Sequence, residues 1–332
     1  PRVASSDLSI LSQRSLLQVF LSACGIFCKQ SSIGLKQGAE AIIGGSSAED
    51  RRMETSTEPN VSTAIARFWQ LHETGCFLLP NPWDAGSAKI LEHLGFKALA
   101  STSAGVAFAR GLPDTLSSLS RDGALDNLRQ IMAVTTLPVN ADFQNGFAHQ
   151  PEGVAENVRL CVGTGVAGLS IEDATGEESE PLYDLKLAIE RIKAARAAID
   201  STKTGVVLTA RCEAWLVGDP KAFQTAIERL VAYSEAGADC LYAPGVKDTK
   251  EIEAIVKAVA PKPVNVLMSS PVPGLSVSVL QDLGVRRISL GSALSRVAWG
   301  AFTRASKNII ETGTFDSLSE AASFAELNRL FE

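Results

Sequence analysis

Residues that could carry out acid–base or metal chemistry stand at the ends of short apolar segments in the middle of the chain. Asp142, Glu172 and Arg211 each directly follow such a segment. Carboxylates that face one another repel, and oxygen ligands suit Mg²⁺, which keeps most of its waters and binds through one or two carboxylates. We therefore expect Mg²⁺, or else Mn²⁺, near Asp142 and Glu172. Further polar residues stand at equivalent places, namely Thr102, Ser103, Asp173, Glu213, Tyr242 and Asn265.

Arg211 adds a cation to this acidic set. Its guanidinium is a planar fork that can bind a carboxylate or a phosphonate through two parallel hydrogen bonds. A structural ion pair with Glu213 is the alternative role for Arg211. For Asp142 and Glu172 the alternative is capping of the helices that follow them. Asn265 could instead hold a loop.

The segments that carry these residues recur at a regular interval. Eight apolar segments start between residues 77 and 287, about 30 residues apart, which is the length of one strand–helix unit. Amphipathic stretches such as Leu185–Ile199 and Lys221–Ala236 lie between them and predict helices, two of which end before Gly237 and Gly284. The predicted strands are Phe77–Leu79, Ala98–Ser101, Leu137–Ala141, Gly168–Ile171, Val206–Ala210, Cys240–Ala243, Val264–Met268 and Arg287–Leu290.

Apolar strands that alternate with helices predict a parallel sheet that is buried on both faces. Eight such units without a GxGxxG or GxxxxGK[ST] phosphate loop favour an α/β fold of the (β/α)8 TIM-barrel type over a doubly wound sheet. Catalytic groups of such barrels lie at the C-terminal ends of the strands, where the polar residues above stand. We expect the barrel and a helical C-terminal tail to occupy residues 61–332.

The composition excludes several classes of protein. The chain has 332 residues, of which 45% are hydrophobic and 20% charged, so it is neither disordered nor a small disulfide scaffold. Its net charge of −6 argues against a nucleic-acid partner. No uncharged apolar run reaches the length of a membrane span. The six cysteines form no CxxC pair and predict free thiols.

Residues 1–60 are expected to form a separate extension. Residues 1–48 contain ten serines, four Lys or Arg residues and only two acids, a composition that organelle transit peptides share. A non-catalytic extension is the alternative. Residues 46–62 are polar and predict a linker. We expect a cytoplasmic protein, or a mitochondrial one if residues 1–48 are a transit segment.

Six sequence pieces together carry a resemblance to a known family, namely FLLPNPWDAGSA (77–88), STSAGVAFARGLPD (101–114), PVNADFQNGFA (138–148), GLSIEDATG (168–176), ARCEAW (210–215) and PVNVL (263–267). The segment from Phe77 to about Ala301 resembles the isocitrate lyase / phosphoenolpyruvate mutase superfamily. The resemblance implies a (β/α)8 barrel whose eighth helix is exchanged between protomers, usually in a homotetramer built as a dimer of dimers. It also implies chemistry next to a carbonyl of small oxo or hydroxy acids, through an enolate-type intermediate with Mg²⁺.

The resemblance assigns metal ligands. The family's DxDxGxG motif falls on residues 142–148, so that Asp142 matches the direct magnesium ligand. Asp114 and Glu172 match carboxylates that hold metal-bound water. Gln144 stands where the family has its second aspartate, and this difference removes one charge from the metal site.

The resemblance also assigns substrate contacts. Arg211 matches the arginine that binds the substrate carboxylate, and Trp83 and Asn265 are expected to line the pocket. A further segment resembles the one that donates backbone N–H groups to the substrate oxyanion, namely Thr102, Ser103, Ala104 and Gly105.

The loop after the fourth predicted strand departs from the family. Lyase members carry a KKCGH-type loop there, whose cysteine is the catalytic acid or base, whereas residues 173–183 contain neither Cys nor Lys. The mutase-type loop, with its Lys and Asn, is not evident either. A classical isocitrate or methylisocitrate lyase mechanism is therefore not expected. The acid/base candidates are Tyr183, Tyr242, Glu213 and Cys212.

The expected function is a Mg²⁺-dependent lyase that cleaves or forms a C–C bond in a small 2-oxo or 2-hydroxy carboxylic acid. A phosphonopyruvate-type mutase or hydrolase is one alternative, and a different reaction at the same oxyanion site is another. A barrel that binds a small acid without turnover is the alternative that Gln144 and the changed loop favour.

Overall fold

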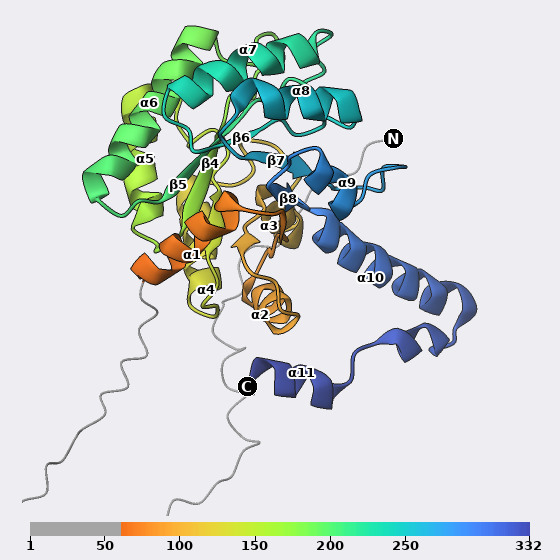
Figure 1. The fold of residues 1–332 in the computed structure, drawn as a ribbon. Coiled ribbons are helices and arrows are strands. Elements are labelled where there is room, and N and C mark those ends of the chain that lie inside the picture. The colour runs from red at the N-terminus through yellow and green to blue at the C-terminus, as the bar shows by residue number, and fades with distance from the viewer. Residues whose placement is uncertain (1–60) are drawn as a thin grey trace, which may run out of the picture. The chain divides into compact units, whose positions relative to one another are not determined.

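Eight parallel strands form a nearly closed barrel in the computed structural model, which describes residues 61–332 (Figure 1). Hydrogen-bonded neighbours follow the order β1-β8-β7-β6-β5-β4-β3-β2, so the first strand pairs with the last. The (β/α)8 fold predicted from the sequence is thereby confirmed. The strands are β1 Phe77–Leu79, β2 Leu99–Ala100, β3 Val139–Asp142, β4 Gly168–Glu172, β5 Val207–Arg211, β6 Cys240–Tyr242, β7 Val264–Leu267 and β8 Arg287–Ser289.

Loop contacts join β1 to β2, the two strands at the ends of the hydrogen-bonded order. The Ala100 N–H donates to the Pro80 carbonyl at 3.0 Å, and Asn81 Nδ2 donates to the Ser101 carbonyl at 2.9 Å. Asn81 Oδ1 also accepts the N–H groups of Leu290 and Gly291. One side chain after β1 therefore ties together the loops of β1, β2 and β8 at the C-terminal end of the barrel.

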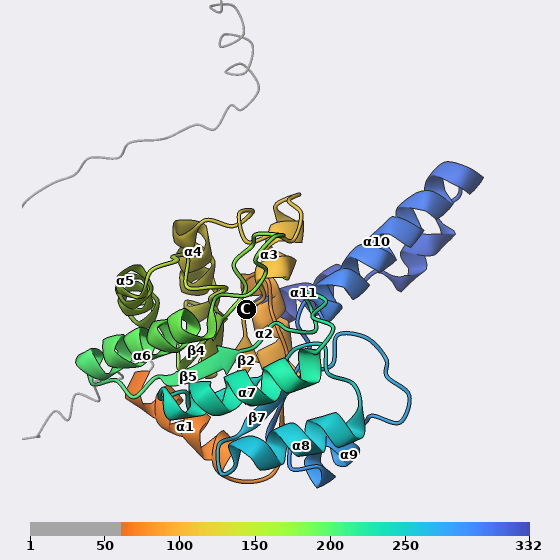
Figure 2. The ribbon, with the colours of Figure 1, turned by 90° about the horizontal axis from the view of Figure 1, so that it is seen from above.

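Helices alternate with the strands and surround them (Figure 2). Gly237 and Gly284 have φ values of +105° and +87°, as expected for glycines just past a helix end. The helices are α1 Val61–Glu73, α2 Ala85–His93, α3 Ser103–Ala109, α4 Arg121–Met132, α5 Pro151–Val162, α6 Leu185–Thr202, α7 Ala222–Glu235, α8 Thr249–Val259, α9 Val277–Asp282, α10 Ala293–Thr312, the 3-10 helix η1 Asp316–Glu320 and α11 Phe324–Phe331.

Helix α1 contacts residues at or next to the starts of the strands. The rings of Phe68, His72 and Phe77 pack edge to face, with centroids 4.7 to 6.1 Å apart. Trp69 Nε1 donates to the Gly205 carbonyl, just before β5. Arg287, the first residue of β8, reaches His72.

The polar linker predicted over residues 46–62 is two residues too long, because α1 begins at Val61.

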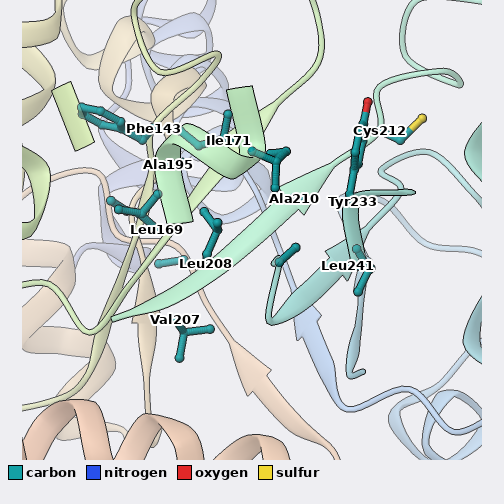
Figure 3. Close-up of a cluster of buried hydrophobic side chains, with 14 of the residues drawn as sticks. Phe143, Leu169, Ile171, Ala195, Val207, Leu208, Ala210, Cys212, Tyr233 and Leu241 are labelled. Atoms are coloured by element: carbon teal, nitrogen blue, oxygen red, sulfur yellow. The ribbon is translucent and has the colours of Figure 1, made fainter. Parts of the chain in front are cut away.

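The main core lies between the strands and the helices packed around them. Figure 3 shows part of it, with Leu169 and Ile171 of β4, Val207, Leu208 and Ala210 of β5, and Tyr233 of α7. These side chains are at most 1% exposed. The apolar strands predicted from the sequence are buried because helices cover them.

The C-terminal helices α10 and α11 are more exposed than the other α-helices, since α10 has one buried residue, Ser295, and α11 has none. Helix α10 leaves the barrel beside β8, and α11 returns toward α2, where Lys89 donates to the Phe331 carbonyl (Figures 1 and 2). Residues 61–332 belong to one compact unit. None of the helices between residues 61 and 332 is long and apolar enough to span a membrane. The expected extension over residues 1–60, with its transit segment, lies outside the described residues.

Candidate active site

A cavity of about 420 Å³ is lined by residues at and beyond the C-terminal ends of the strands. This is the end of the barrel at which the sequence placed the catalytic groups. Most of the predicted site residues line it, and so do several that were not predicted. The wall includes Asn81, Thr102, Ser103, Ala104, Asp114, Asn140, Asp142, Arg211, Tyr242, Asn265, Arg287, Ser289 and Arg296.

Arg211 ends β5 and contacts three carboxylates. Its Nη1 lies 2.7 Å from Asp142 Oδ1, its Nη2 lies 3.0 Å from Glu172 Oε2, and its Nε lies 2.8 Å from Glu213 Oε1. Asp142 and Glu172 end the neighbouring strands β3 and β4, so strand pairing brings all three side chains to one edge. The predicted alternative of an Arg211–Glu213 ion pair is present, but as one part of a larger cluster.

The acidic side chains of this cluster outnumber the guanidinium. Burial raises the pKa of Glu172 to about 8. The nearby Arg211 lowers this pKa, whereas the neighbouring carboxylates of Glu213 and Asp142 raise it further. Burial also raises the pKa of Glu213, and burial together with Asp142 raises the pKa of Asp114. One guanidinium therefore does not compensate all of the carboxylates, and a further cation would lower all three pKa values.

The cluster suits a hydrated divalent cation. No group of three or more His, Cys, Asp or Glu side chains within residues 61–332 is arranged to hold a metal ion directly. Mg²⁺ needs only one or two direct carboxylates, however, because it retains most of its waters. The uncompensated charge and the all-oxygen donor set of Asp142, Glu172 and Asp114 fit such an ion.

Gln144 lies in a strained turn beside these carboxylates. Its φ is +45°, in the left-handed region that non-glycine residues rarely adopt, and its carbonyl accepts the Glu172 N–H at 3.0 Å. Its buried Oε1 has no hydrogen-bond partner among the described residues. The side chain is 3% exposed and is not part of the cavity wall. Gln144 therefore does not face the cavity itself.

The segment after β2 is held against Asp142. Asp142 Oδ2 accepts the Ser103 N–H and the Ser103 hydroxyl, both at 2.8 Å. The Gly105 N–H donates to the capping hydroxyl of Thr102 at 3.2 Å. Of the predicted oxyanion donors, Ser103 and Gly105 are thus already engaged. Ala104 lines the cavity, and its N–H has no protein partner within the described part of the chain.

Seven of the predicted site residues do not line the cavity. Four of them are Glu172, Glu213, Gln144 and Tyr183, and the other three are buried or packed elsewhere in the fold. The Cys212 side chain is buried in the main core (Figure 3), and burial together with Asp173 raises its thiol pKa far above the ordinary value. Cys212 is therefore wrong as a catalytic acid or base. Trp83 packs behind the wall, against the cluster of Val106, Leu119 and Ala124, so its prediction as a lining residue is also wrong. Gly105 is the third, because it is buried inside α3.

The remaining acid/base candidates occupy different places. Tyr242, the last residue of β6, lines the cavity, and the Arg211 guanidinium lies 5.2 Å from its ring centroid. Burial raises the pKa of Tyr242 to about 12. Glu213 is held by Arg211, and its N–H donates to Asp173 Oδ1. Tyr183 hydrogen-bonds His149 at 2.7 Å and does not line the cavity. Of the two candidate tyrosines, Tyr242 is thus the one that faces the cavity.

The deep part of the cavity contains residues that the sequence analysis missed. Arg287 is 2% exposed, and its Nε and Nη2 donate to Asn265 Oδ1 and Thr209 Oγ1. Asn265 Nδ2 in turn donates to Ser289. Ser289 is the last residue of β8, so a search of the C-terminal ends of the strands could have found it. Arg287 is the first residue of β8, so the same search could not have found it.

Comparison with known proteins identifies relatives of this chain. Residues 68–310 match the phosphoenolpyruvate phosphomutase family. A candidate lyase/mutase from Burkholderia cenocepacia J2315 is 45% identical, with a TM-score of 0.79 over 82% of this chain and 97% of that protein. Oxaloacetate acetylhydrolase, solved with its product oxalate, is 25% identical, with a TM-score of 0.73 over 81% of this chain and 94% of that one. The 2-methylisocitrate lyase of Escherichia coli K12 is 33% identical over 50% of this chain and 56% of its own length.

Proposed function

Because the chain belongs to the phosphoenolpyruvate mutase family, within the isocitrate lyase / phosphoenolpyruvate mutase superfamily, we propose that it is a Mg²⁺-dependent carbon–carbon lyase. The proposed substrate is a small 2-oxo or 2-hydroxy carboxylic acid. The supporting observation is the Arg211 cluster at the mouth of the barrel, where one guanidinium lies among Asp142, Glu172 and Glu213. Related proteins that act on methylisocitrate or oxaloacetate agree with an acid substrate.

Arg211 binds the substrate carboxylate in this proposal. A guanidinium has five N–H groups. Arg211 Nε donates to Glu213 Oε1 and Nη1 donates to Asp142 Oδ1, while Nη2 lies 3.0 Å from Glu172 Oε2 in an ion pair. N–H groups therefore remain on both terminal nitrogens. Because the three carboxylates fix the plane of the guanidinium, the fork is oriented before the substrate arrives, which lowers the entropy lost on binding.

Asp142, with Asp114 and Glu172 through water, would hold Mg²⁺, and Gln144 would contribute no charge. The ion would supply Lewis-acid stabilisation of the negative charge that develops on the substrate oxygen. The Ala104 N–H is the backbone donor that remains available for the same oxygen.

Tyr242 is the proposed proton donor. Its phenol is protonated at neutral pH, and burial raises its pKa further, to about 12. It lies on the cavity wall beside Arg211, so a carboxylate bound at Arg211 would place the adjacent carbon within its reach. A phenol of this pKa suits an enolate-like carbanion, whose own basicity is high.

The same proposal includes a homo-oligomer. Helix α10 has one buried residue, Ser295, and exposes Val297, Trp299 and Phe302 by 65%, 42% and 64%. Apolar surface of this kind is typical of a subunit contact. An exchange of α10 between protomers, as the family resemblance implies, would cover it.

A substrate screen tests the proposed function. Purified protein is incubated with 2-oxo, 2-hydroxy and phosphono acids, with and without Mg²⁺, and products are identified by mass. Release of pyruvate, glyoxylate or an equivalent fragment only with Mg²⁺ is the expected result. Release of phosphate would identify a phosphonopyruvate hydrolase, and conversion of a phosphonate to a phosphate ester a mutase. Binding of an acid without any product would identify a binding protein instead.

A further inference from the structure

A second cavity of about 250 Å³ adjoins the catalytic cavity, on the side of the loops that follow β5, β6 and β7. We call it the side chamber and define it by Trp215, Leu216, Val246, Leu267, Ser269 and Val272. Leu216, Leu267 and Ser269 line the catalytic cavity as well. The two spaces therefore adjoin at these three residues, and Leu216 is the residue that a group extending from a substrate at Arg211 would pass to enter the chamber.

The wall between the two cavities is built on the strand that carries Arg211. The N–H groups of Leu216 and Val217 both donate to the Glu213 carbonyl, at 2.8 and 3.0 Å. The Glu213 N–H is itself fixed by Asp173 Oδ1 at 2.8 Å. Leu216 is thus held by a short turn at a set position relative to Arg211, although its side chain is 57% exposed.

Gly245 allows Trp215 and the loop after β6 to pack closely on one side of the chamber. Gly245 has a φ of +97°, and a Cβ at this position would lie 2.7 Å from the Trp215 Cβ. Any other residue would strain the backbone and displace the tryptophan. The close approach keeps Trp215 against the loop after β6, so that its side chain and Val246 form one continuous apolar surface.

The mostly apolar lining of the side chamber suits an apolar group of a ligand. Most of the lining side chains are apolar, and Ser269, Ser270 and Lys247 are the polar ones. Among residues 61–332, no acidic residue lines the chamber. A water molecule occupies about 30 Å³ in the liquid, so the chamber of about 250 Å³ has the volume of about eight waters, which is room enough for an alkyl group of about four to six carbons. Burying such a group against these side chains would release water from an apolar surface, which favours binding.

We propose that the side chamber binds an apolar substituent of the substrate, so that the preferred substrate is a 2-oxo or 2-hydroxy acid with an alkyl chain of about four to six carbons. This inference rests on the proposed function, because it takes Arg211 as the site of the carboxylate. The charged end of the ligand lies at Arg211, and its chain passes Leu216 into the chamber.

A chain-length series tests the inference. The dissociation constants of pyruvate, 2-oxobutanoate, 2-oxohexanoate and 4-methyl-2-oxopentanoate are measured by calorimetry on the Mg²⁺-loaded full chain. Each buried methylene is expected to tighten binding about fourfold, so 2-oxohexanoate should bind at least about tenfold more tightly than pyruvate. Equal affinity across the series would overturn the inference.

A matched pair of variants locates the effect. Val272→Trp fills the chamber and should remove the preference for the longer acids while leaving the pyruvate affinity unchanged. Val277→Trp places the same side chain at a 43% exposed position on α9, outside the chamber, and should leave the whole series unchanged. A Val272→Trp variant that melts like the wild type and keeps the chain-length preference would contradict the inference.

The outcomes also separate the inference from the proposed function. If pyruvate binds and Arg211→Lys weakens it, but longer acids bind no more tightly, only the inference fails. If none of the acids binds, both fail.

Discussion

Arg211 is the side chain on which the proposed chemistry depends most. It lies among Asp142, Glu172 and Glu213, and each of these contacts is between 2.7 and 3.0 Å. Arg211 and its three carboxylates form an acidic cluster around one guanidinium, and Tyr242 and Ala104 line the same cavity as Arg211. In the proposed function, Arg211 binds the substrate carboxylate, Asp142 would bind the metal ion, and Tyr242 transfers the proton, so each step can be tested by its own substitution.

Arg211→Lys should weaken substrate binding by more than about 1 kcal/mol, which is about fivefold. The lysine ammonium keeps the charge that the buried carboxylates need, but it lacks the planar fork. Affinity for a 2-oxo acid, measured by calorimetry beside the melting temperature, checks this. An unchanged affinity in a variant that melts like the wild type would show that the carboxylate binds elsewhere.

Gln144→Asp should tighten Mg²⁺ binding about tenfold, because it restores a carboxylate near the proposed ion. Asp142→Ala should weaken Mg²⁺ binding by at least about tenfold, since it removes the direct ligand. The control is Asp126→Ala, which removes a 63% exposed carboxylate on α4. Titration of the metal-free protein with Mg²⁺ gives the three affinities, and identical values would refute the assigned metal site.

Tyr242→Phe should lower kcat by about a hundredfold or more while KM changes little, as loss of a general acid does. Tyr183→Phe should keep kcat, because Tyr183 bonds His149 and does not line the cavity. If Tyr183→Phe lowers kcat and Tyr242→Phe does not, Tyr183 is the general acid instead. Steady-state kinetics with the substrate found in the screen decides between them.

At the scale of elements, the barrel depends on α1 as well as on its strands. His72 of α1 is 7% exposed; its Nδ1–H donates to the Phe68 carbonyl at 2.7 Å, and its Nε2 lies 3.4 Å from Arg287 Nη1. Burial and the nearby Arg287 lower the pKa of His72 to about 3. The folded protein thus keeps this imidazole neutral against the strand starts.

This neutral histidine should make stability depend on pH. The unfolded chain protonates His72 below the ordinary pKa of 6.5 while the folded protein does not, so the unfolded state binds more protons. The contribution is fully present above pH 6.5 and declines as the pH falls toward 3, by about 1.4 kcal/mol per pH unit. Urea unfolding of the wild type and His72→Asn between pH 7 and about 4 should show that difference in slope. Parallel curves would mean that His72 titrates normally.

At the scale of the whole molecule, the C-terminal helices expose more apolar surface than the barrel does. Phe302, Ile310 and Phe324 are 64%, 85% and 90% exposed. Such side chains on α10 and α11 have few neighbours within residues 61–332, whereas the strands of the barrel are buried. We therefore expect the complete particle to contain more than one copy of the chain.

Phe302→Asp should dissociate this oligomer, because a carboxylate in an apolar contact loses its hydration. Light scattering after size exclusion measures the mass of the particle. Leu160→Asp is the control, since Leu160 is 40% exposed on α5, away from α10. A wild-type particle with the mass of one chain, 35.1 kDa, would refute the expected oligomer.

The sequence by itself determined the barrel and the edge of the barrel at which the site lies. Apolar segments that recur at the length of a strand–helix unit have few ways to be buried, and Asp142, Glu172 and Arg211 end three neighbouring strands. Only the tertiary structure decided which side chains face the cavity. Arg211 and Cys212 are adjacent in sequence, yet one lines the cavity and the other lies in the core. Arg287 lines the cavity from the start of β8, because the barrel interior brings side chains from different depths of several strands together, and no sequence pattern records those distances.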